Sequence, residues 1–93
     1  MRSEFRLKVE EIIGKEKIDP FKVFIDGYPI KKGRRWRIKF GGVVEPLSPS
    51  QISQIKALPG VLAVRPPYHP ITFRDCYAGW TITTEIPPSK IVL

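Results

Sequence analysis

The sequence predicts a single α+β domain in which two helices lie on one face of a four-stranded antiparallel sheet, in the order α-β-β-α-β-β. Three observations predict this class. Residues 49–58 combine helix start signals with an apolar stripe at helical spacing, residues 33–40 alternate apolar and charged side chains, and short apolar runs bounded by Gly and Pro recur along the chain. The 93 residues are expected to form one small basic domain, 1–93.

The first segment, residues 3–14, is compatible with two structures. As a helix it places four apolar residues on one face, and Gly14 lies near its end. The four are Phe5, Val9, Ile12 and Ile13. As a strand it alternates Phe5, Leu7 and Val9 with charged residues. Two consecutive acids and the length of the segment favour the helix, although the helix leaves Leu7 off the apolar face. The strand remains the alternative.

A β-hairpin is predicted for residues 21–27 and 35–40, with a turn at 27–34 whose glycines and proline favour chain reversal. Side chains on a strand point to opposite faces in turn. Trp36, Ile38 and Phe40 therefore share one face, which we expect to enter the core. The other face is cationic.

The second helix is predicted over residues 49–58. Ser48 is its expected N-cap, Pro49 fits the first helical position, and Gln51 completes a capping box. Ile55 lies on the apolar stripe, and a Pro-Gly pair ends the helix.

The last third of the chain is predicted to form two strands. Residues 61–64 are a short apolar run, which is expected to be covered on both faces and to end at the prolines that follow. Residues 71–73 restart the strand after a bend, and residues 79–86 alternate well enough to be the final strand.

Residues 87–93 are predicted to form an extended C-terminal tail that ends in three apolar side chains. The tail either folds back as an edge strand or adds to the sheet of a partner protein. In the second case the docking residues are Ile91, Val92 and Leu93.

The composition indicates a charged but folded protein. The formal net charge is +7, while 42% of the residues are hydrophobic, as in ordinary globular proteins. No apolar run approaches the ~20 residues needed to cross a bilayer, and we expect a cytoplasmic protein with no membrane partner. The chain contains no Asn, a single Met, a single Cys and ten Pro, a usage that resembles that of thermophile proteins.

The strongest functional signal is a group of six cations within nine residues, with no acid among them. They are Lys31, Lys32, Arg34, Arg35, Arg37 and Lys39. Such a row suits a polyanion, and nucleic-acid phosphates are the predicted ligand. Tyr28 and Tyr68 lie in predicted turns and are candidates for base stacking. DNA and RNA, single- and double-stranded, all remain open as the partner.

No enzyme signature accompanies this surface. His69, Asp75 and Cys76 are the one cluster that invites a catalytic interpretation. A proline-flanked His is more typical of a surface loop, and a lone Cys seven residues later is more typical of a small buried hydrophobic residue. There is no phosphate loop, dinucleotide motif or cysteine-pair zinc motif. We therefore expect no catalytic residues, cofactor, metal or small-molecule substrate. The alternative to nucleic-acid binding is a non-catalytic accessory subunit of a larger complex, such as a polymerase, a ribosome or a viral assembly.

Overall fold

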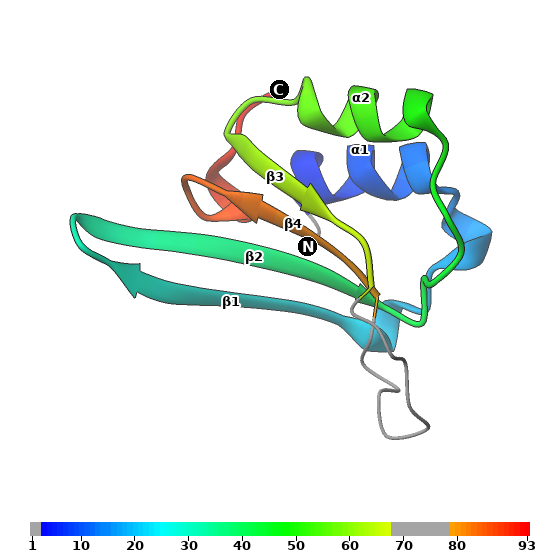
Figure 1. Cartoon of the computed structure of the whole chain (residues 1–93), viewed down its shortest axis with the longest axis horizontal. Helices are drawn as coiled ribbons and strands as arrows, with labels where there is room; N and C mark the ends of the chain where they lie inside the picture. Colours follow the sequence, from blue (N-terminus) through cyan, green and yellow to red (C-terminus); the bar gives the residue numbers. More distant parts are fainter. Residues whose placement is uncertain (1–2, 68–78) are drawn as a thin grey trace.

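The chain folds into two layers, with both helices on the same side of a four-stranded antiparallel sheet (Figure 1). The computed structural model describes residues 3–67 and 79–93. The helices are α1 (Glu4–Ile13) and α2 (Pro49–Lys56), and the strands are β1 (Val23–Ile30), β2 (Gly33–Gly41), β3 (Val61–Arg65) and β4 (Gly79–Thr84). Three short 3-10 turns, η1 (Lys15–Lys17), η2 (Pro20–Lys22) and η3 (Pro88–Lys90), complete the order. The predicted fold class and element order are confirmed.

The first segment is a helix, as preferred over the strand. The hydroxyl oxygen of Ser3 accepts a hydrogen bond from the Arg6 backbone N–H at 3.2 Å and caps α1. Phe5, Val9 and Ile13 are buried in the core, and Leu7 is partly exposed on the other side of the helix. Burial of this apolar face favours the helical periodicity over the strand alternation that the same residues also fit.

The second helix begins as predicted. Ser48 and Gln51 exchange both hydrogen bonds of a capping box, at 3.1 and 2.8 Å, and Ile55 is fully buried. The Gln51 side-chain amide also donates to the carbonyl oxygen of Ile12 at 3.0 Å, which ties the start of α2 to the end of α1. The helix ends at Lys56, two residues earlier than predicted.

The β1–β2 hairpin is longer than predicted, and its turn is shorter. The expected turn at 27–34 is reduced to Lys31 and Lys32, because the strands remain paired as far as Ile30 opposite Gly33. The positive φ of the reversal, +110°, falls on Gly33, so that neither lysine adopts a strained backbone. Pro29 is tolerated in β1 because β1 is an edge strand.

The strand order is β1-β2-β4-β3, which corrects the prediction for residues 61–64. Instead of being covered on both faces, β3 is an edge strand with an irregularity between Val61 and Ala63, and Leu62 is 46% exposed. The inner position belongs to β4, where Ile82 is fully buried and pairs with Ile38 of β2. The predicted restart at 71–73 lies outside the described residues.

The tail folds back on the body, but not as the edge strand predicted. Residues 88–90 form η3, and Pro88 and Ile91 are buried. Residues 87–93 therefore do not form the extended tail that was predicted, because Ile91 packs in the hydrophobic core and holds this segment against the body. Val92 and Leu93 beyond it are 79% and 49% exposed. Among the described residues, no helix is long and apolar enough to span a membrane.

Candidate nucleic-acid interface

The alternation along β2 produces the two faces that the sequence predicted. Ile38 and Phe40 are fully buried beneath the helices, whereas Arg35 and Arg37 are exposed on the opposite face and Lys39 is partly exposed there. Residues two apart on a strand are separated by about 7 Å, so these three cations form a row of about 14 Å. We call this side of the sheet, opposite α1 and α2, the open face.

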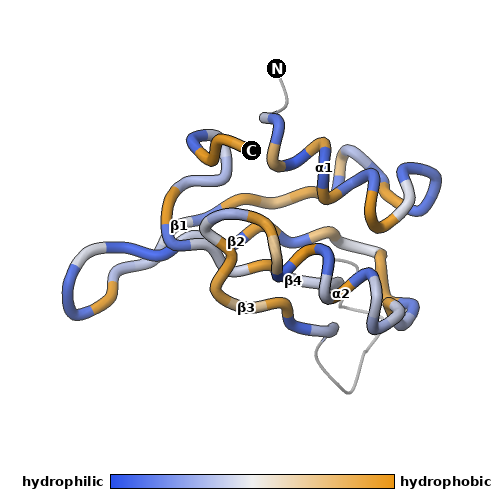
Figure 2. The backbone as a smooth tube through the Cα atoms, turned by 90° about the horizontal axis from the view of Figure 1, so that it is seen from above, coloured by the Kyte–Doolittle hydropathy of each residue, from blue (hydrophilic) through white to orange (hydrophobic). Residues whose placement is uncertain are grey.

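The hairpin projects beyond the rest of the sheet. Strand β4 pairs with β2 only from Trp36 onward, so residues 33–35 and their partners 28–30 pair only with each other. We call residues 28–35 the arm. Figures 1 and 2 show it extending from the body as a two-stranded ribbon. Three residues at ~3.4 Å each give it a reach of about 10 Å past the edge of β4.

The four cations of the arm do not form the single row that the sequence suggested. Arg34 belongs to β2 rather than to a turn, so it lies on the opposite face of the ribbon from Arg35, and Lys31 and Lys32 occupy the tip. All four are exposed. None of them forms an ion pair within residues 3–67 and 79–93. The arm therefore carries unneutralised charge on both faces and at its end.

Arg37 is already engaged with its neighbours on the sheet. Its Nη2 and Nε donate to Oδ2 and Oδ1 of Asp26 at 2.7 and 3.3 Å, from directly across the β1–β2 ladder. Its guanidinium also lies over the Tyr28 ring, 4.6 Å from the centroid. The hydrogen bond to Asp26 raises the pKa of Arg37, although burial of the guanidinium acts in the opposite direction. Of the predicted phosphate ligands, Arg37 is the one whose charge is matched.

Two aromatic rings of the hairpin lie under arginine guanidinium groups. Tyr28, a predicted stacking residue, lies on the open face beneath Arg37. Trp36, expected in the core, is only partly buried and lies across from Gly27. A Cβ atom at Gly27 would lie 2.9 Å from the indole, and Arg34 covers this ring at 5.6 Å from the centroid. Tyr68 lies outside the described residues.

Two residues of the open face were missed from sequence. Asp26 is remote from the cationic row along the chain, and only the cross-strand register places it opposite Arg37. Arg65, at the end of β3, is exposed and pairs with Thr81, which in turn pairs with Lys39. Lys39 and Arg65 are therefore separated by two strand spacings, about 10 Å. The position of Asp26 depends on the register of the hairpin and that of Arg65 on strand order, and local sequence periodicity encodes neither.

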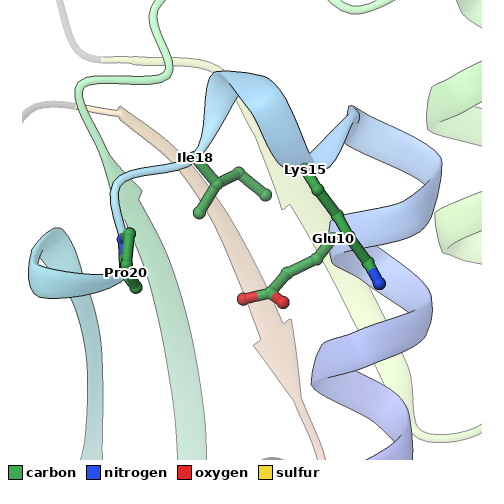
Figure 3. A pocket seen from close by; sticks show the side chains of 4 residues that line it. All are labelled: Glu10, Lys15, Ile18 and Pro20. Carbon is green, nitrogen blue, oxygen red and sulfur yellow. The ribbon is translucent and has the colours of Figure 1, made fainter.

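The described residues hold no group of three or more His, Cys, Asp or Glu that could bind a metal ion, and His69, Asp75 and Cys76 lie outside the described ranges. Figure 3 shows a pocket lined by Glu10, Lys15, Ile18 and Pro20. The Glu10 carboxylate there is buried and accepts a hydrogen bond from Arg6 Nε at 3.1 Å. We assign this carboxylate a structural ion pair.

Comparison of the chain with protein-family models, with curated proteins and with solved structures finds no match. The functional argument therefore rests on the geometry and charge of the interface.

Proposed function

We propose that this protein binds nucleic acid through phosphate contacts made by the arm and the adjoining open face. The observation that carries the proposal is the set of four exposed cations on the arm, none of which is paired with an acid among the described residues. Lys31, Lys32, Arg34 and Arg35 hold this charge on a projecting ribbon, where a polyanion can reach it from several sides. The net charge of +7 adds attraction at longer range.

Sequence specificity is expected to be low. Both helices use their apolar faces to cover the sheet, and neither projects from the body as a recognition helix does. Contacts from Lys and Arg to phosphate position a protein on nucleic acid without reading the bases. The surface is therefore suited to binding many sequences with similar affinity.

The number of unmatched cations sets the expected salt dependence. Each neutralised phosphate contributes about −0.9 to the slope of log affinity against log salt on duplex DNA. The four arm cations give a slope of about −3.6, and engagement of Lys39 and Arg65 as well would extend it to about −5.4. Arg37 is left out of this count because Asp26 already neutralises it.

A salt titration tests the proposal. Affinity for oligonucleotides of unrelated sequence should fall linearly on a plot of log affinity against log salt, with a slope in this range on duplex DNA and a shallower slope on single strands. Glu substitutions at Lys31, Lys32 and Arg35 should abolish binding without loss of the folded state, because all three side chains are exposed. Lys56→Gln, on the last turn of α2, is the control that should bind as the parent does. Salt-insensitive binding, or equal loss in the control, would refute the proposal.

A second candidate, an accessory subunit of a larger complex, is favoured by one observation. Val92 and Leu93 expose apolar surface at the end of the chain while the neighbouring Ile91 is buried. Docking through the tail would then involve these two residues and not Ile91.

A further inference from the structure

We propose that the arm enters the major groove of double-stranded DNA. The inference rests on the proposed nucleic-acid binding and names the form of nucleic acid that the arm fits. Three features carry it: the dimensions of the arm, the charge on both of its faces, and the guanidinium groups that cover the aromatic rings of the β1–β2 hairpin.

The dimensions of the arm match the major groove. Its reach of about 10 Å equals or exceeds the groove depth of ~8.5 Å. A two-stranded ribbon with side chains on both faces is about 10 Å thick, judged from the spacing at which sheets pack. It therefore fits a major groove ~12 Å wide, whereas the ~6 Å minor groove is too narrow. The A-form RNA duplex is also a poor fit, because its major groove is deep and narrow.

The distribution of charge suits a groove with two walls. Arg34 and Arg35 point to opposite faces of the ribbon, and Lys31 and Lys32 lie at its tip. Phosphates line both sides of a DNA groove, so a ribbon between them meets negative charge on each face. A single strand lying along the open face would leave Arg34 without a phosphate.

The aromatic rings argue against a single strand. Proteins that bind single strands stack bases on accessible aromatic side chains. In the hairpin the Tyr28 ring is covered by Arg37 and the Trp36 ring by Arg34. Stacking a base there would first require displacing a guanidinium, so the arm gains little from unpaired bases.

Two variants distinguish the contribution of the arm's length to groove binding from the contribution of its charge. In the first, residues 29–34 are replaced by Asn-Gly, which joins Tyr28 to Arg35 by a two-residue turn and shortens the ribbon. In the second, Lys31, Lys32 and Arg34 are all changed to Gln at full length. Both lose the same three cations. Neither change touches a strand pair of the β2–β4 ladder.

Methylation by dimethyl sulfate reports the groove occupied, because it modifies guanine N7 in the major groove and adenine N3 in the minor groove. At saturation on mixed-sequence duplex DNA, the parent and the full-length Gln variant should lower N7 methylation at least twofold relative to N3. The shortened variant should not. Duplex DNA should also bind at least tenfold more tightly than a single strand or an RNA duplex of equal length.

The alternative outcomes overturn the inference. N3 protection, or N7 protection that survives shortening, would each exclude insertion of the arm into the major groove. N7 protection lost equally in both variants would overturn the assignment to the reach of the arm and leave only its charge. Preferred binding of single strands or of RNA would exclude the duplex DNA assignment. If the parent protein still binds oligonucleotides in a salt-sensitive manner, each of these outcomes leaves the proposed function intact. A parent protein that binds no oligonucleotide in a salt-dependent manner would instead overturn the proposed function itself.

Discussion

Substitution of Asp26 by Asn should strengthen nucleic-acid binding. In the folded protein the Asp26 carboxylate holds Arg37 through two hydrogen bonds, at 2.7 and 3.3 Å, and neutralises it. An amide keeps the size of the side chain but removes its charge. Arg37 then lies on the open face between Arg35 and Lys39 with its charge unmatched, and it becomes available to a phosphate.

The size of the effect follows from one additional phosphate contact. The slope of log affinity against log salt should steepen by about 0.9, from about −3.6 to about −4.5 for the arm. Between 50 and 200 mM salt, the loss of affinity should then grow from about 150-fold to about 500-fold. The cost to stability is small, about 0.2 to 1 kcal/mol, because both side chains of the ion pair are about half exposed.

The measurement is a fluorescence-anisotropy titration of a labelled duplex at five or more salt concentrations, with chemical denaturation of the same samples. Glu45→Gln is the matched control, because it removes one negative charge and releases Lys17 from a 3.6 Å ion pair at the opposite end of β2 from the arm. Its slope should not change. The double variant Asp26→Asn, Arg37→Gln should return to the parent slope. An unchanged slope for Asp26→Asn, or an equal gain in the control, would refute the reasoning.

Three further predictions concern the body of the protein and are measured by the free energy of unfolding. Ser48→Ala removes the cap of α2 and should cost about 0.5 to 2 kcal/mol without changing oligonucleotide affinity; a protein as stable as the parent would show that the capping box is dispensable. Ile55→Ala should cost about 2 to 5 kcal/mol because the side chain is fully buried, and a smaller loss would place the stripe of α2 outside the core. Ile91→Ala should be destabilising to a similar degree, whereas deletion of Val92 and Leu93 should not be. If that deletion releases a bound partner in a pull-down while the parent shows no salt-sensitive oligonucleotide binding, the accessory-subunit function replaces the proposed one.

The sequence alone determined the local elements of this protein. Helix α2 is specified by its own capping box and apolar stripe, and the two faces of β2 follow from an alternation that any strand must obey. Helix α1 is not specified by its local pattern alone, because its apolar residues satisfy both the helical and the strand periodicity over a short distance. The burial of Phe5, Val9 and Ile13 against the sheet selects the helix.

Only the tertiary structure decided how the cations are arranged. The register of the hairpin is a pairing between segments, and it moves the turn to Lys31 and Lys32 and places Arg34 on the face away from Arg35. The same register brings Asp26 opposite Arg37, which a linear sequence separates by ten residues. Strand order likewise places β3 at an edge. These relations depend on contacts between distant segments, and the local periodicity of a chain does not encode them.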